Sequence, residues 1–226
     1  MIIHLWHHMG LADEQTLHRL QIARESRENE YRAYPGVWIA PALFFSRDSR
    51  KVGDTDPVPY VRDMIAQGMA YAKKPDDMIF LTNADIGFAP DITLHLTKTC
   101  HMRRRDIPYI ARPLTAEEIE SGEEYPGGDG FAFTADWWKA NGRLFPDMLL
   151  GRYGWDSAMR NLIRRGKGVE VKNQLFHQKH SAPWNETSYD IDLMPGNRHN
   201  RQLLLAWIEK YGGSTEDHLH PDLKYK

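Results

Sequence analysis

Short apolar runs that alternate with helix-like stretches constrain the fold of this chain more than any other feature. Ile2–Trp6 and Met78–Thr82 have the length of strands and are almost wholly apolar, as in strands buried on both faces of a sheet. Between them, residues 60–72 repeat apolar side chains at the spacing of one helix face. This order predicts an α/β fold, with a mostly parallel sheet flanked by helices in a single domain.

The remaining predicted elements follow the same logic of periodicity and capping. The predicted strands lie at 37–40, 109–111, 131–133 and 169–171. The first predicted helices are one after an Asp13 N-cap and one that begins at Pro90-Asp91 and runs through Met102. Further helices are predicted after a Thr134 cap, at 155–165 with a stop at Gly166, and at about 198–211. Residues 46–57 are polar and turn-rich, which indicates a mobile loop. We expect one domain over residues 1–212 and a flexible C-terminal tail over residues 213–226.

Composition narrows the functional classes. The net charge is −2, so the chain has no overall positive field that would attract nucleic acid. A single cysteine, Cys100, excludes an intramolecular disulfide framework, and we expect it to be a buried apolar residue. No apolar run approaches the roughly 20 residues of a membrane span, and the N-terminus lacks the pattern of a signal peptide, so we expect a cytoplasmic protein. Two basic clusters, 103–105 and 164–167, are typical of solvated helix ends but also suit phosphate-bearing ligands.

The tripeptide Asn83-Ala84-Asp85 is the first candidate for chemistry. It follows the buried strand directly, and side chains two apart on an extended backbone share a face. Amide and carboxylate oxygens there can bind Mg²⁺ or Mn²⁺. Alternatively, Asn83 and Asp85 have a purely structural role and only cap the next turn. From the tripeptide alone, both interpretations stay open.

Two glycine-containing segments add further acids. Asp129 stands at the start of a predicted strand after Gly127-Gly128, and Asp156 follows Gly154 at the start of a predicted helix. Asp156 either caps that helix or serves as a general base for an acceptor hydroxyl. Trp155 either offers a flat apolar face to a sugar ring or fills the core, and Trp138 is a second candidate for contact with an acceptor.

A histidine pair near the C-terminus is the last candidate. His177 and His180 follow a predicted strand and flank Lys179. A neutral imidazole can ligate a metal, and the lysine can meet a phosphate.

Taken in this order, the motifs resemble those of the GT-A nucleotide-diphospho-sugar transferases, over roughly residues 2–185. Asn83-Ala84-Asp85 is similar to that family's Asp-x-Asp motif, and Gly154-Trp155-Asp156 is similar to its acceptor-side segment. The resemblance implies a GT-A-like (Rossmann-like) fold of the small soluble bacterial or phage type. It also implies a metal, Mn²⁺ or Mg²⁺, held by Asp85, Asn83 and one of His177 and His180. Asp156, or otherwise Asp129, would be the catalytic base of an inverting reaction, and a retaining reaction stays open.

The same resemblance assigns the ligands. A nucleoside-diphosphate sugar, with a UDP-sugar such as UDP-glucose favoured, would lie against the end of the first strand, near His7 and His8. Asp56 and Arg62 would meet it from the segment before the metal motif, although Arg62 could also decorate a solvent-facing helix. The acceptor would be a glycan hydroxyl or a hydroxymethylated base in phage DNA.

Three other functions are alternatives to this one. Because Asn83 replaces an acid of the motif, a non-catalytic nucleotide-sugar-binding protein is the main alternative. A nucleotidyltransferase is disfavoured because residues 9–13 lack a glycine-rich loop with Lys or Arg. A zinc hydrolase is disfavoured because the sequence has no His-Glu-x-x-His pair.

Overall fold

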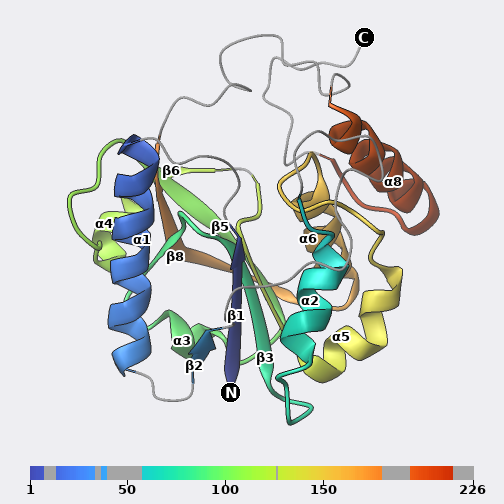
Figure 1. The fold of residues 1–226 in the computed structure, drawn as a ribbon, viewed down its shortest axis with the longest axis horizontal. Helices are drawn as coiled ribbons and strands as arrows, with labels where there is room; N and C mark the ends of the chain where they lie inside the picture. The colour runs from blue at the N-terminus through green and yellow to red at the C-terminus, as the bar shows by residue number, and fades with distance from the viewer. Residues whose placement is uncertain (8–13, 34–36, 40–57, 126, 180–193, 216–226) are drawn as a thin grey trace.

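A computed structural model describes residues 1–7, 14–33, 37–39, 58–125, 127–179 and 194–215 (Figure 1). Among these residues, the chain forms a mixed α/β fold around a curled eight-stranded sheet of order β2-β1-β3-β7-β5-β8-β4, with β6 paired to β5. The strands are β1 (Ile2–His7), β2 (Val37–Ile39), β3 (Met78–Asn83), β4 (Gly87–Phe88), β5 (Cys100–Ile107), β6 (Glu123–Glu124), β7 (Gly130–Thr134) and β8 (Val169–Gln178). The helices are α1 (Glu14–Ala33), α2 (Val61–Met69), α3 (Ile92–His95), α4 (Ala116–Glu120), α5 (Ala135–Asn141), the 3-10 turn η2 (Gly142–Leu144), α6 (Trp155–Arg165) and α8 (Pro195–Tyr211).

The sheet is mixed rather than mostly parallel, which corrects the expectation from the sequence. β1, β2 and β3 are mutually parallel, but β7 runs antiparallel to both of its neighbours, β3 and β5. Beyond it, β8 is parallel to β5 and β4 is antiparallel to β8. The physical reason lies between β5 and β7, where the chain forms only the short α4 and β6. Without a long crossover helix, the chain returns beside β5 in the opposite direction.

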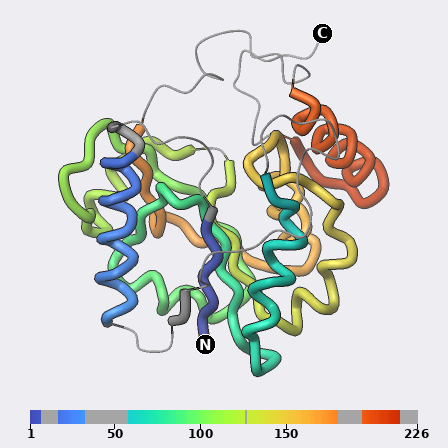
Figure 2. The backbone as a smooth tube through the Cα atoms, in the orientation of Figure 1, coloured from blue at the N-terminus to red at the C-terminus, as the bar shows by residue number. Residues whose placement is uncertain are grey.

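Helices cover both faces of the sheet (Figures 1 and 2). α2, α5, α6 and α8 lie on one side, and α1, α3 and α4 lie on the other. β3 shows how the sequence produces this arrangement, because its side chains alternate between two core clusters. Ile79 and Leu81 pack in the cluster that contains residues of α2, α6 and α8, whereas Phe80 packs with Ile92 of α3. Burying each such side chain stabilises the fold by about 1.5–3 kcal/mol.

Several local predictions are confirmed. β3, α2 and α6 form where the apolar periodicity places them, and Gly166 follows the last residue of α6. Thr134 caps α5, since its hydroxyl accepts a hydrogen bond of 3.1 Å from the backbone N–H of Trp137. Cys100 is fully buried, and this burial raises the pKa of its thiol to about 12, as expected for a residue that acts as an apolar filler.

Other predictions were wrong. The helix that opens near Asp91 ends at His95, and Met102 lies in β5. The cluster 103–105 is therefore part of a strand and not a helix end, because pairing with β6 and β8 decides the conformation. Residues 109–111 form no strand, and the short helix α4, which was not among the predicted elements, follows them.

The remaining predictions concern the chain's less regular parts. Residues 213–215 do not separate from the domain, since Asn161 of α6 bonds to the backbone of Ser214 through both ends of its amide. The expected tail beyond residue 215, the Asp13 cap and the loop at 46–57 lie outside the described residues. Within the described part of the chain, no helix has the length and apolar character to span a membrane.

Candidate functional site

One edge of the sheet gathers the ends of several strands. β1 and β3 finish together, because His7 pairs in register with Asn83. β7 begins at the same edge, so Asp129, which precedes Gly130, lies beside the end of β3. Further along, β5 extends past β7 and pairs Asp106 with His177 of β8. Ligands of open α/β sheets bind beyond such strand ends.

A histidine held between two carboxylates forms the centre of the site. His177 of β8 is 4% exposed, with Nε2 3.2 Å from Oδ2 of Asp85 and Nδ1 3.1 Å from Oδ1 of Asp106. Burial and Arg104 lower the pKa of His177, but its hydrogen bonds to Asp106 and Asp85 outweigh them, so that pKa lies above its usual value. Burial alone would raise the pKa of Asp85. The hydrogen bond to His177 outweighs this effect and holds that pKa well below its usual range.

Arg104 of β5 joins this centre to a second pair of acids. Its Nε donates to Asp106 at 2.7 Å, its Nη1 donates to Asp129 at 2.8 Å, and its guanidinium lies 3.7 Å from the ring centroid of Tyr125. Asp129 is 4% exposed, and its Oδ2 has no hydrogen-bond partner within the described structure. Burial, together with the nearby charge of Asp156, raises the pKa of Asp129 against the lowering effect of Arg104.

Asp156 lies in the first turn of α6, where its charge also suits the positive end of the helix dipole. It is not the N-cap, because Gly154 takes that position with a φ of 79° and no side chain caps the helix. Trp155 is 6% exposed and packs against Phe131, with ring centroids 5.4 Å apart. Of the two interpretations of Trp155, the structure places it in the core and leaves little of its face for an acceptor.

The turn that carries Asp85 is fixed by a residue that the sequence did not single out. Arg27 of α1 donates to the carbonyl oxygens of Ala84 and Ile86 at 2.6 and 3.0 Å. Asn83 is half-buried, and its side chain forms no hydrogen bond with the described residues, so it does not cap the turn. Its amide therefore stays available beside Asp85.

Arg104, Asp106 and Tyr125 were also missed from the sequence. Arg104 and Asp106 are two apart, and such residues share a face when the segment is a strand. This spacing would identify the pair if the basic run were predicted as a strand, but its composition is typical of a helix end.

Two side chains of the site could contribute ligands to a divalent cation. Asp85 and His177 bring an oxygen and a nitrogen ligand atom together, and Asp106 would hold the other imidazole nitrogen in its N–H form. A carboxylate behind a ligating histidine is the usual arrangement at metal centres. Within the described ranges no group of three or more His, Cys, Asp and Glu side chains has a geometry that could hold a metal ion, so these two side chains would need further ligands from substrate or water.

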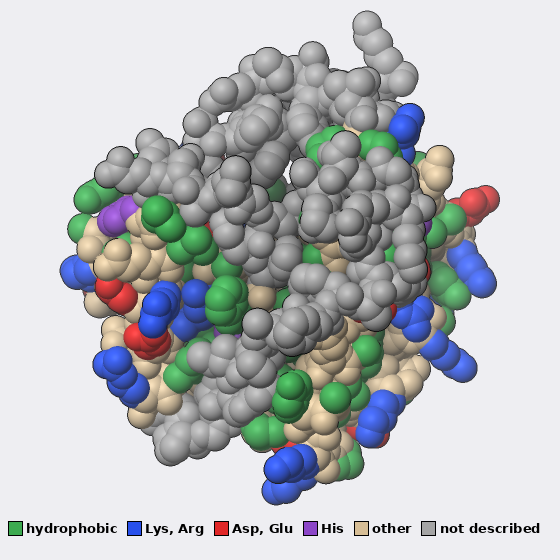
Figure 3. Space-filling model, in the orientation of Figure 1, with side chains coloured by type: hydrophobic (Ala, Val, Ile, Leu, Met, Phe, Trp, Pro, Cys, Tyr) green, Lys and Arg blue, Asp and Glu red, His purple; other side chains and the backbone are tan. Residues whose placement is uncertain are grey.

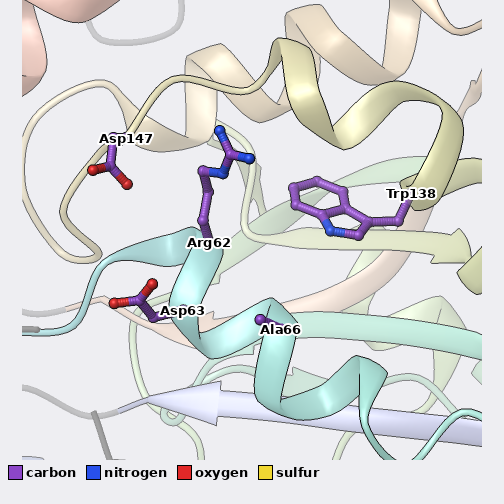
Figure 4. A pocket seen from close by; sticks show the side chains of 5 residues that line it. All are labelled: Arg62, Asp63, Ala66, Trp138 and Asp147. Atoms are coloured by element: carbon purple, nitrogen blue, oxygen red, sulfur yellow. The ribbon is translucent and has the colours of Figure 1, made fainter. Parts of the chain in front are cut away.

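Two of the predicted binding residues lie elsewhere. Arg62 of α2 and Trp138 of α5 line one pocket together with Asp63, Ala66 and Asp147 (Figure 4). This pocket shares no residue with the cluster around His177. His8, Asp56 and His180 lie outside the described residues, and of His7 only the backbone position is described.

Comparison with known proteins adds no assignment, because the sequence matches no family profile and no curated protein. The geometry of the site is therefore what indicates its function.

Proposed function

We propose that the chain is a metal-dependent glycosyltransferase with a GT-A-like fold, which moves a sugar from a nucleoside-diphosphate sugar to an acceptor hydroxyl. A UDP-sugar is the favoured donor. The observation that carries the proposal is the meeting of Asp85, His177, Asp129 and Asp156 at one edge of the sheet, although 92 residues separate the first two. Their contacts and charges match the roles that such a reaction needs.

Asp85 and His177 would hold Mn²⁺ or Mg²⁺, with the Asn83 amide beside them. Such a cation neutralises the donor's diphosphate and assists departure of the nucleoside diphosphate. Asp106 and Arg27 act through other residues: the first orients the imidazole of His177, and the second fixes the turn that carries Asp85.

An acid–base role falls to Asp129 or Asp156. A buried carboxylate with a raised pKa is a stronger proton acceptor than an ordinary carboxylate, and Oδ2 of Asp129 has no other hydrogen bond among the described residues. In an inverting reaction this carboxylate takes the proton of the acceptor hydroxyl while the hydroxyl oxygen attacks the anomeric carbon. A retaining reaction would need no such base.

For the acceptor, the charges favour a glycan over DNA. Arg103 and Arg105 both pair with Glu124, and Arg103 also approaches Glu170, so this cluster is largely neutralised. Figure 3 shows Lys and Arg side chains scattered around the described part of one face, with acidic side chains among them. A duplex-binding protein would instead present a basic stripe to the phosphates.

Calorimetric titration of UDP, GDP and their sugars, with Mn²⁺ and with a chelator, tests the proposal. We expect metal-dependent binding of one nucleotide, its loss in Asp85→Ala, and no change in the control Asp136→Asn, which alters an exposed acid of α5. Normal turnover by Asp85→Ala would overturn the metal assignment. Donor binding with neither transfer nor hydrolysis would favour a nucleotide-sugar-binding protein instead.

A further inference from the structure

The segment 147–154 carries the chain to Asp156 of the candidate site. It consists of turns and one isolated β-bridge, and α6, which holds Asp156 in its first turn, begins directly after it. A segment without a helix or a strand ladder has to satisfy its backbone N–H and C=O groups by contacts with the rest of the molecule. Those contacts therefore decide where α6 starts and where Asp156 lies.

Backbone partners lie on one side of this segment. The N–H of Val61 donates to the carbonyl oxygen of Met148, and the N–H of Leu150 donates to the carbonyl oxygen of Pro59, each at 2.9 Å. Along an extended backbone, the groups of successive residues point to opposite sides. The residue between these two, Leu149, therefore turns its own N–H and C=O away from that side.

Two asparagines of α8 bind the segment from the other side. The amide of Asn200, which is fully buried, donates from Nδ2 to the carbonyl oxygen of Leu149 and accepts from its N–H at Oδ1, both at 2.8 Å. A primary amide has the same donor and acceptor as a peptide group, so Asn200 takes the place of a neighbouring strand. One turn earlier in α8, Oδ1 of Asn197 accepts from the N–H of Tyr153 at 2.9 Å.

α8 also packs against the start of α6. Its Leu204 is fully buried and lies so close to Gly154, the N-cap of α6, that a Cβ on this glycine would be 2.8 Å away. Leu204 and Trp155 belong to one core cluster, and Figure 1 shows α8 beside α6 at the periphery of the molecule. α8 thus contacts the chain at Tyr153 and Gly154, which come shortly before Asp156 in the sequence.

From these contacts we infer that Asn197 and Asn200 are positioning residues, which hold the segment 147–154 so that Asp156 lies beside Asp129. Asp156 has a role in the reaction only under the proposed function, on which the inference rests to that extent. The two asparagines are 3% and 0% exposed, so they act through the backbone that they bind and not on a ligand. Such support is needed because a displacement of about 1 Å at a reacting group can lower turnover about a hundredfold.

The pKa of Asp129, followed by carbon-detected NMR of its carboxyl group in the full chain, reports the position of Asp156 without any substrate. Burial raises that pKa and the charge of Asp156 adds to the rise, whereas Arg104 and His177 lower it. Asn200→Ala releases the segment, so the pKa of Asp129 should fall. Asp156→Asn should also lower it, and adding Asn200→Ala to that variant should cause no further change; a further fall there would contradict the inference.

A second variant and a matched control accompany this titration. Asn197→Ala removes one hydrogen bond to the segment but keeps both bonds of Asn200, so it should lower the pKa of Asp129 by less. The control on α8 is Trp207→Phe, which removes the hydrogen bond of 2.7 Å that the indole Nε1 donates to the carbonyl oxygen of Leu144, outside the segment. Thermal denaturation should show that this control also destabilises the chain, yet the pKa of Asp129 should stay unchanged.

Release of UDP from UDP-glucose with Mn²⁺ is the second readout. Asn200→Ala should lower kcat by about tenfold or more, while the affinity for UDP in calorimetry should stay as in the unmodified chain. A pKa of Asp129 that is unchanged in both asparagine variants, or that falls equally in Trp207→Phe, would overturn the inference, and so would an unchanged kcat. If the unmodified chain neither binds UDP nor releases it, the proposed function fails, and the titration of Asp129 alone decides whether the asparagines position Asp156.

Discussion

Replacing Arg104 by methionine tests how the candidate site is held together. The guanidinium is 16% exposed and donates to Asp106 and Asp129, whose side chains are 14% and 4% exposed. Methionine keeps an unbranched apolar stem but removes every donor. Asp106 keeps its contact with His177, whereas Asp129 loses the cation that offsets its burial.

The expected loss is large because removing one partner of a buried ion pair leaves the other charge uncompensated. This costs about 3–5 kcal/mol in the free energy of unfolding at pH 7. For a chain of this length, the melting temperature should fall by about 10 °C. Arg103→Met is the matched control, because Arg103 is more exposed and its ion pairs with Glu124 and Glu170 are longer, at 3.2 and 3.3 Å. That control should lose no more than about 1 kcal/mol.

The pH dependence follows from Asp129. Its pKa is raised in the folded state, so the folded chain binds the proton more tightly than the unfolded chain does. Stability is therefore lost as pH rises from the unfolded pKa of about 4 through the folded value, and removing Arg104 deepens that loss. Urea denaturation at pH 7 and pH 5 should show the deficit of Arg104→Met narrowing at the lower pH.

A second substitution tests whether the uncompensated charge of Asp129 causes the loss of stability. Asp129→Asn in the Arg104→Met background removes the stranded charge and should restore about 1–3 kcal/mol. If the double variant is no more stable than Arg104→Met, or if Arg104→Met is as mild as Arg103→Met, the ion pair is not what stabilises this edge.

Three further predictions concern stability. Burial, with nearby arginines, lowers the pKa of His101 to about 3, so stability should fall as pH drops below about 6.5, where the unfolded chain gains a proton. His101→Met should flatten that slope in denaturant titrations, and an unchanged slope would contradict the assignment. Thr134→Ala removes the cap of α5 and should cost about 1 kcal/mol by chemical denaturation, most of which Thr134→Ser should recover. Gly154→Ala should cost more than about 1–2 kcal/mol, because φ is 79° and the new Cβ would lie 2.8 Å from Leu204; a thermal shift near zero would refute this.

Local signals explain which parts of the fold could be predicted. β3 and α6 have strong periodicity, and Thr134 stands where a cap is expected, so residues near in sequence decide their conformation. β5 could not be predicted in this way. Its basic run is stabilised as a strand by partners in β6 and β8, which come later in the chain.

The residues of the candidate site also differ in whether local sequence or tertiary contact identifies them. Asp85, Asp129 and Asp156 can be identified from the sequence because each acid adjoins a predicted strand or helix end. His177 can be identified because it follows the strand predicted at 169–171, although β8 in fact extends through it. Arg104 and Arg27 did not stand out, since only the tertiary structure brings Arg104 to Asp129 and Arg27 to the turn that carries Asp85.

The parallel pairing of β5 with β8 sets the order in which the site can assemble. Asp106 and His177 are register partners, yet 71 residues separate them, and β7, α5 and α6 form in between. Closing so long a loop costs entropy that only the completed packing returns. We therefore expect refolding chains to acquire helical structure well before the centre around His177, and a chain that stops short of β8 to fold its first strands without ever forming that centre.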